Sequence, residues 1–145
     1  MPVSNNCELN YGFNPLKIST AVQSLMIVED NPDLQQFYTF LFKTTPWRII
    51  SQISNCLIAK KCYTEIFPKP TIVLIDIELP GCSGFSVARY ILRNNPVQKI
   101  VLISGKVDFM DDSSIPIDLC SIPRMSKPFH FNDLLNVLNR LASSN

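Results

Sequence analysis

Short apolar runs and longer periodic segments alternate along most of the chain. The apolar runs are short and rich in β-branched residues, which predicts strands at 23–30, 47–54, 71–76 and 99–104. Segments with apolar residues at helical spacing follow the first three runs, which predicts helices at 33–43, 55–67 and 84–95. In the first of these helices one face would carry Leu34, Phe37, Tyr38, Leu41 and Phe42.

The last third of the chain gives a weaker pattern. Pro116 and a cluster of Asp and Ser residues limit the segment 105–119 to a short or broken helix. The segment 120–126 predicts a fifth strand at the edge of the sheet, because it contains a proline. A final helix is expected at 131–144, where leucines recur at helical spacing.

Strands that alternate with helices in this way predict an α/β fold, with a parallel sheet covered by helices on both faces. We expect one domain at 23–145, preceded by an N-terminal extension at 1–22 that is polar and only weakly periodic.

Composition and charge narrow the function classes. Of the 145 residues 46% are hydrophobic and 17% charged, and the net charge of +1 comes without a basic cluster. Electrostatics therefore gives no case for binding to nucleic acid or to a membrane surface. The N-terminus lacks the pattern of a signal peptide, and the five cysteines form no C-x-x-C pair, so we expect reduced thiols and a cytoplasmic location. The single histidine, His130, has no neighbours at ligand spacing, which argues against a zinc site.

The ends of the predicted strands carry the candidate chemistry. Glu29 and Asp30 end the first strand, Asp76 the third and Ser104 the fourth, while Lys127 follows the fifth. Ligands of open parallel sheets bind beyond the carboxyl ends of the strands, so these side chains are expected to converge. Carboxylates that lie close together repel one another unless a cation neutralises them, and Mg²⁺ prefers hard oxygen ligands of this kind. A carboxylate beside such a metal can attack a phosphoryl group and become an aspartyl phosphate.

Four motifs in this order resemble the receiver domain of response regulators in two-component signalling: VED at 28–30, LIDIELPGCSG at 74–84, VLISG at 101–105 and SKPF at 126–129. The resemblance covers about residues 23–143 and implies a doubly wound, flavodoxin-like sheet of strand order 2-1-3-4-5.

The same resemblance implies a role for each residue of the site. Asp76 would be the phosphoacceptor. Glu29, Asp30, Asp76 and the backbone carbonyl of Glu78 would hold Mg²⁺, Glu29 through water. Lys127 would pair with the phosphoryl group and precede a cis peptide bond, and Ser104 would swing towards the phosphoryl oxygens.

The resemblance also implies partners. The phosphoryl donor would be a phosphohistidine on a sensor histidine kinase or a histidine phosphotransfer protein, and the output a downstream protein target. A homodimer is possible, whereas direct binding of nucleic acid or membrane is not expected. The chain would not be an enzyme beyond catalysing its own aspartyl phosphorylation and dephosphorylation, and we expect no output domain within residues 1–145.

Two features depart from the family pattern. Receivers commonly carry an aromatic residue three positions before the conserved lysine, and here that position is Arg124, which we expect at the surface, where it could contact a partner. Glu78 and Lys106 flank the site and are predicted to form a salt bridge that shields the phosphoryl group from water and slows self-dephosphorylation.

The sequence leaves two alternatives to a phosphoacceptor receiver. The first is a degenerate receiver that binds a protein partner without phosphorylation, as Arg124 and the broken fourth helix would allow. The second is a hydrolase of the haloacid-dehalogenase type, whose D-x-D motif the DIE at 76–78 resembles. That family places its nucleophile after the first strand, whereas two predicted strands precede Asp76.

Overall fold

The structure, a computed structural model, describes residues 22–144. It contains five strands and four α-helices in the order β1 (Ser24–Val28), α1 (Pro32–Phe42), β2 (Arg48–Ile53), α2 (Cys56–Glu65), β3 (Ile72–Asp76), α3 (Gly84–Asn94), β4 (Lys99–Ser104), β5 (Arg124–Ser126) and α4 (Phe131–Ser143). The strands are all parallel and lie in the order β2-β1-β3-β4-β5. The predicted fold class and strand order are confirmed. The predicted extension lies outside the described residues apart from Val22.

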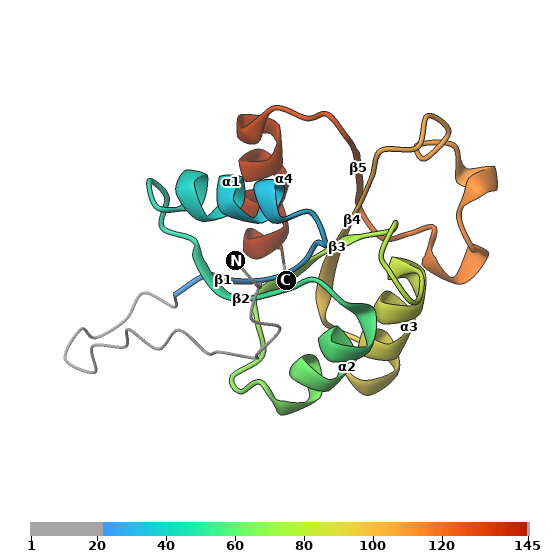
Figure 1. The fold of residues 1–145 in the computed structure, drawn as a ribbon, viewed down its shortest axis with the longest axis horizontal. Helices are drawn as coiled ribbons and strands as arrows, with labels where there is room; N and C mark the ends of the chain where they lie inside the picture. The colour runs from blue at the N-terminus through green and yellow to red at the C-terminus, as the bar shows by residue number, and fades with distance from the viewer. Residues whose placement is uncertain (1–21, 145) are drawn as a thin grey trace.

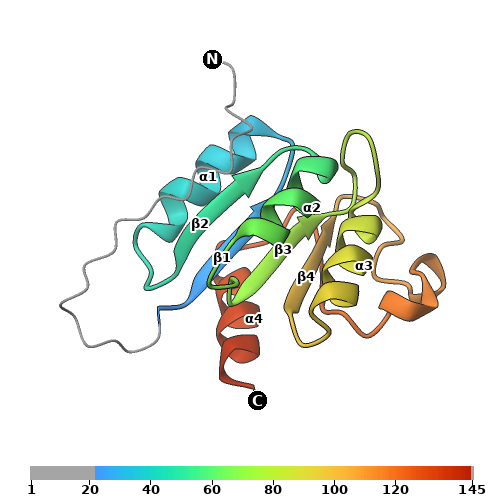
Figure 2. The ribbon, with the colours of Figure 1, turned by 90° about the horizontal axis from the view of Figure 1, so that it is seen from below.

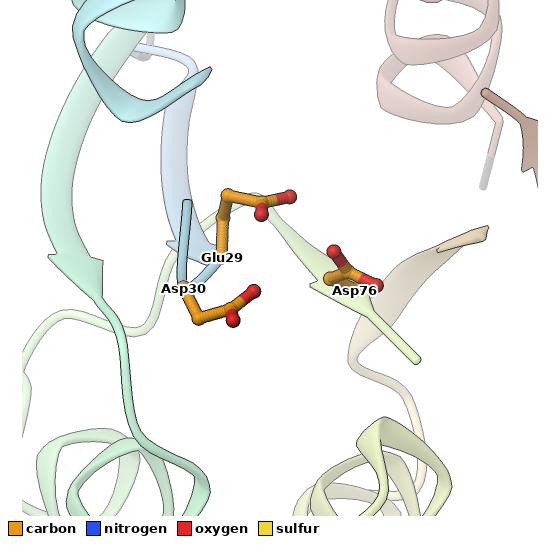
Figure 3. Close-up of side chains that lie close together, drawn as sticks. All are labelled: Glu29, Asp30 and Asp76. Carbon is orange, nitrogen blue, oxygen red and sulfur yellow. The ribbon is translucent and has the colours of Figure 1, made fainter. Parts of the chain in front are cut away.

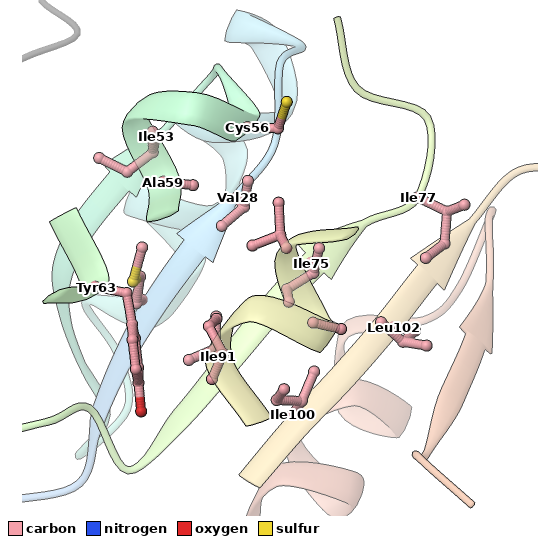
Figure 4. Packing of buried hydrophobic residues seen from close by; sticks show 14 of the residues in the cluster. Val28, Ile53, Cys56, Ala59, Tyr63, Ile75, Ile77, Ile91, Ile100 and Leu102 are labelled. Carbon is pink, nitrogen blue, oxygen red and sulfur yellow. The ribbon is translucent and has the colours of Figure 1, made fainter. Parts of the chain in front are cut away.

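Helices cover both faces of the sheet, α1 and α4 on one and α2 and α3 on the other (Figures 1 and 2). Successive residues of β1, β3 and β4 point to opposite faces, and both sets are apolar and buried. Figure 4 shows the core beneath α2 and α3, where Val28 and Ile75 pack against Ala59 and Ile91. Strands buried on two faces account for the continuous apolar runs in the sequence.

Asparagine and serine side chains begin three of the helices. Asn31 accepts hydrogen bonds from the backbone amides of Asp33 and Leu34 at the start of α1, and Asn55 and Ser83 cap α2 and α3 in the same way. Such caps pair amides that the helix itself leaves unpaired. The carboxylates at the end of β1 are therefore not needed as helix caps.

The face of α1 that meets the sheet differs from the predicted one. Gln35, Tyr38 and Phe42 are buried, whereas Phe37 is 51% exposed. Because residues 37 and 38 are both apolar, the sequence pattern does not decide which of them faces the sheet, and the two choices differ by a rotation of about 100° about the helix axis. The side-chain amide of Gln35 has a buried partner, the backbone carbonyl of Glu29, which makes the burial of this polar residue tolerable.

Between β4 and β5 the chain forms two 3₁₀ turns, Asp112–Ser114 and Ile117–Leu119, in place of an α-helix. The expectation of a short or broken helix is confirmed, and β5 is shorter than predicted. Arg124 does not lie free at the surface as expected. Its side chain is 10% exposed, and its guanidinium donates to the carboxylate of Asp112 at 2.5 Å and to the carbonyl oxygen of Met110 at 3.2 Å. Arg124 therefore holds the 3₁₀ segment against the end of the sheet.

The expectation of five reduced thiols is wrong for the described residues. Cys56 and Cys82 form a disulfide, Cys62 is disulfide-bonded as well, and Cys120 is free. Cys56 and Cys82 are separated by 26 positions, so no local spacing marks the pair. Their elements lie at the same end of the sheet, and this places their Cα atoms 6.0 Å apart.

None of the helices in 22–144 has the length and apolar character needed to cross a membrane.

Candidate functional site

Three carboxylates meet at the carboxyl end of the sheet, as the strand ends predict. β1 and β3 are neighbours with Val28 opposite Ile75, so Glu29, which follows Val28, and Asp76, which ends β3, lie side by side. Figure 3 shows Glu29 and Asp30 facing Asp76, and one oxygen of each carboxylate lies within 4.8 Å of the others. Glu29 is 2% and Asp76 4% exposed, whereas Asp30 is open to solvent. This is a set of hard oxygen donors with one side open to water, the environment that Mg²⁺ prefers.

Lys127 lies between the two buried carboxylates. Its Nζ is 2.6 Å from Oδ2 of Asp76 and 2.9 Å from Oε2 of Glu29. The backbone brings it there because β5 pairs with β4 up to Ser126, and the amide of Lys127 donates to the carbonyl oxygen of Ser104 at 2.7 Å. The Lys127–Pro128 peptide bond is cis, as the family resemblance implied. The ammonium group therefore compensates two carboxylates that have little contact with solvent.

Burial and charge act in opposite directions at this site. Burial raises the pKa of Asp76 above its usual value, and the hydrogen bonds from Lys127 and from the Glu78 amide only partly offset this. Burial by itself would lower the pKa of Lys127, but its hydrogen bonds to Asp76 and Glu29 outweigh this effect and raise it. Lys127 is therefore cationic, and burial is the main reason why the carboxyl group of Asp76 ionises less readily than in water.

Glu78 and Ser104 are directly connected. Ser104, at 0% exposure, donates from Oγ to the carboxylate of Glu78 and accepts from the amide of Lys106 at 3.1 Å. The amide of Glu78 in turn donates to Oδ1 of Asp76 at 2.9 Å. The predicted Glu78–Lys106 salt bridge is not formed in the described structure, because the Glu78 carboxylate turns inward to the hydroxyl. Lys106 is exposed.

The loop after Asp76 is pressed against the strand that precedes it. A Cβ atom added at Gly84 would lie 2.2 Å from the backbone oxygen of Asp76, which no side chain can tolerate. The amide of Gly84 donates to the carbonyl of Ile77 at 2.9 Å and closes the loop. This glycine therefore allows α3 to begin in direct contact with the backbone of Asp76.

Two further residues of α1 bear on the site and carried no functional prediction. Gln35 donates from Nε2 to the backbone oxygen of Glu29 at 2.5 Å and so fixes the end of β1. The Tyr38 hydroxyl is buried without a hydrogen-bond partner among the described residues. Its burial, and then the negative charges of Glu29 and Asp76, raise its pKa. Tyr38 was expected only as a core residue, because no sequence pattern indicates that its hydroxyl would interact electrostatically with Glu29 and Asp76.

Comparison with known proteins agrees with this geometry. The family "Response regulator receiver domain" matches residues 25–139. The response regulator receiver protein CpdR of Brucella abortus is 25% identical over 122 residues, which is 83% of this chain and 97% of CpdR. The chemotaxis protein CheY of Listeria monocytogenes is 26% identical over 121 residues, 81% of this chain and 97% of CheY.

Solved structures show the same fold. The receiver domain of a sensor histidine kinase from Pseudomonas aeruginosa, described with a magnesium ion coordinated in its active-site cleft, aligns with a TM-score of 0.72 at 22% identity, over 86% of this chain and all of that one (100%). The response regulator TrrA of Thermotoga maritima, described in complex with Mg²⁺-BeF, aligns with a TM-score of 0.70 at 24% identity, over 82% of this chain and 98% of that one.

Proposed function

The chain belongs to the response-regulator receiver family of two-component signalling, and we propose that it works as a phosphoacceptor switch with Asp76 as the acceptor. The observation that carries this proposal is the position of Asp76, buried beside Glu29 and Asp30 with Lys127 bound to its carboxylate. A receiver needs an acceptor, a metal site and a cation at one place, and these residues supply all three.

The proposed reaction is a single displacement at phosphorus. An oxygen of the Asp76 carboxylate forms a bond to the phosphorus of a phosphohistidine, the phosphorus–nitrogen bond breaks, and the imidazole nitrogen keeps the electron pair and is protonated. Lys127 stands 2.6 Å from the acceptor, where its charge can stabilise the phosphoryl oxygens as negative charge develops on them. The donor is a histidine kinase or a histidine phosphotransfer protein, and the chain catalyses only its own phosphorylation and dephosphorylation.

The carboxylates fit Mg²⁺ as the cofactor. Asp30 and Asp76 would hold it directly, Glu29 through water, and the backbone carbonyl of Glu78 would complete the protein ligands. The bound ion supplies charge neutralisation at the phosphoryl group. Two structural neighbours are described with magnesium bound, which supports the same metal here.

Switching begins at Ser104 in this proposal. Its hydroxyl leaves the Glu78 carboxylate and donates to a phosphoryl oxygen, and the change passes through β4 to the 3₁₀ segment held by Arg124. A downstream protein would read the altered segment as a shift between two populations. A homodimer and a cytoplasmic location stay predictions.

The alternative, a receiver that binds partners without phosphorylation, is not favoured. Such a role leaves no reason to keep two carboxylates and a lysine desolvated together, because burying charges costs free energy. A haloacid-dehalogenase-type hydrolase is disfavoured by the strand order, in which Asp76 ends the third strand of the chain.

The test is the intact mass of the protein after incubation with acetyl phosphate, with and without Mg²⁺, for the wild type and Asp76→Asn. The expected result is a gain of one phosphoryl group that requires Mg²⁺ and is absent in the variant. No gain, together with no binding of beryllofluoride, would overturn the phosphoacceptor role and support the phosphorylation-independent module.

A further inference from the structure

A covalent tether lies beside the proposed magnesium site. Cys56 is the first residue of α2, and Cys82 lies in the loop that joins β3 to α3. Their Cα atoms are 6.0 Å apart, within the range that a disulfide requires. Gly81, with a φ of 87°, turns the loop immediately before Cys82, and a Cβ atom at Gly81 would lie 3.8 Å from Sγ of Cys56. The backbone of this loop is therefore shaped to bring the two sulfurs together.

The tethered loop also carries Glu78. It begins at Asp76, where Ile77 pairs with Ile103 through a backbone hydrogen bond of 2.9 Å, and it ends at Gly84. Between these anchors, the carboxylate of Glu78 holds Ser104 and its backbone carbonyl is the proposed fourth magnesium ligand. The disulfide adds a third anchor, on α2, to the segment that carries Glu78.

We propose that Cys56 and Cys82 form a redox-sensitive pair, and that their disulfide fixes the Glu78 loop so that the oxidised chain binds Mg²⁺ more tightly than the reduced chain. The binding part of this inference rests on the proposed magnesium site. Oxidation of Cys56 and Cys82 would then regulate the same site that phosphorylation of Asp76 regulates.

The two cysteines differ in a way that suits reversible oxidation. Cys82 is partly exposed and therefore accessible to an oxidant, whereas Cys56 is fully buried at the start of α2, where the sulfur within its reach is that of Cys82. A peroxide would oxidise the Cys82 thiolate to a sulfenic acid and release hydroxide. The Cys56 thiolate would then attack the Cys82 sulfur, forming the sulfur–sulfur bond and releasing a second hydroxide. A dithiol reductant reverses this, because its thiolate can reach the Cys82 sulfur.

Reduction loosens the loop without removing it. The carbonyl oxygen of Pro80 lies 3.6 Å from Sγ of Cys56 and is available to a Cys56 thiol as an acceptor. The closing hydrogen bond of Gly84 is also independent of the disulfide. The expected change in the dissociation constant for Mg²⁺ is therefore modest, about fivefold, the factor that ordering the backbone of roughly one residue supplies.

The first measurement is disulfide mapping of the full chain. The protein is treated with hydrogen peroxide or with a dithiol reductant, free thiols are alkylated, and peptides are separated by mass. A peptide pair linked through Cys56 and Cys82 after oxidation, and alkylated at both after reduction, is expected. Absence of the linked pair from the oxidised sample would overturn the proposal, whatever the state of Asp76.

The second measurement is calorimetric titration of both forms with MgCl₂. Tighter binding by the oxidised wild type is expected, with the difference lost in Cys82→Ser and kept in Cys120→Ser, which removes an exposed free thiol. Cys82 is chosen because a hydroxyl at the fully buried Cys56 could impair folding. Equal affinities of the two wild-type forms, or a difference that survives in Cys82→Ser, would refute the redox link. A redox-dependent affinity with no phosphorylation would instead keep this inference and reject the phosphoacceptor role.

Discussion

The hydrogen bond between Ser104 and Glu78 makes the switch open to a quantitative test. In the described structure the Ser104 hydroxyl is bound to the Glu78 carboxylate, and in the proposed active state it is bound to the phosphoryl group. Replacing Glu78 by alanine removes the competing acceptor but keeps the backbone carbonyl and amide. The variant should therefore destabilise only the state in which Ser104 is held back.

The magnitude follows from the kind of bond. A hydrogen bond to a charged group contributes about 1.5–3 kcal/mol in a protected position, and Glu78 is an exposed residue, so about 1 kcal/mol is the reasonable value here. That free energy corresponds to about fivefold in a binding constant. Beryllofluoride, which imitates a phosphoryl group on Asp76, should bind Glu78→Ala about fivefold more tightly than the wild type at saturating Mg²⁺.

A double-mutant cycle separates this effect from simple charge repulsion. Beryllofluoride affinity is measured by calorimetry for the wild type, Glu78→Ala, Ser104→Ala and the double variant. If Glu78 acts by holding Ser104, its replacement gains little once the hydroxyl is absent. An equal gain in both backgrounds would refute the reasoning, since the carboxylate would then act only through its charge. Glu78→Gln, which keeps an uncharged acceptor, should fall between the wild type and alanine.

Three further predictions concern stability and the 3₁₀ segment. In the presence of a chelator, Asp76→Asn should raise the free energy of unfolding at pH 7. Burial raises the pKa of Asp76 in the folded state, so the wild type loses stability as the pH rises through that raised pKa and the carboxyl group ionises. Asparagine carries no such charge. Urea titrations should show that the variant's gain in stability vanishes below pH 3.8, the ordinary pKa of an aspartate. A variant less stable than the wild type at pH 7 would contradict this prediction. Tyr38→Phe should stabilise the chain by about 1 kcal/mol in the same assay, because it removes a buried hydroxyl that has no partner among the described residues; a destabilised variant would mean that the hydroxyl is paired in solution. Arg124→Ala should make the bonds in 105–123 severalfold more sensitive to limited proteolysis, whereas Arg140→Ala, on the exposed side of α4, should not.

The positions of the site residues could be predicted because they depend on the backbone alone. The carboxyl ends of parallel strands lie at one edge of a sheet, so the residues at or just after the ends of β1, β3, β4 and β5 could be expected to meet there. These residues are Glu29, Asp76, Ser104 and Lys127. The sheet order needed more, and it came from the family resemblance.

Features that depend on side-chain direction were harder to predict. A carboxylate at Glu78 can reach outward to Lys106 or inward to Ser104, and the sequence spacing is the same for both. The inward direction is taken because the buried hydroxyl of Ser104 needs an acceptor, whereas the exposed ammonium of Lys106 is satisfied by water. The predicted salt bridge between Glu78 and Lys106 is therefore not formed, and the Glu78 carboxylate accepts a hydrogen bond from Ser104 instead.

Arg124 shows how one substitution and the loss of a helix are connected. An aromatic side chain at this position could rotate between an outward and an inward site. The guanidinium instead donates to the side-chain carboxylate of Asp112 and to the backbone carbonyl oxygen of Met110, which a regular helix through this segment would pair internally. The arginine and the irregular segment therefore fit each other, and a signal from Ser104 would reach the surface by altering this set of hydrogen bonds rather than by turning a ring.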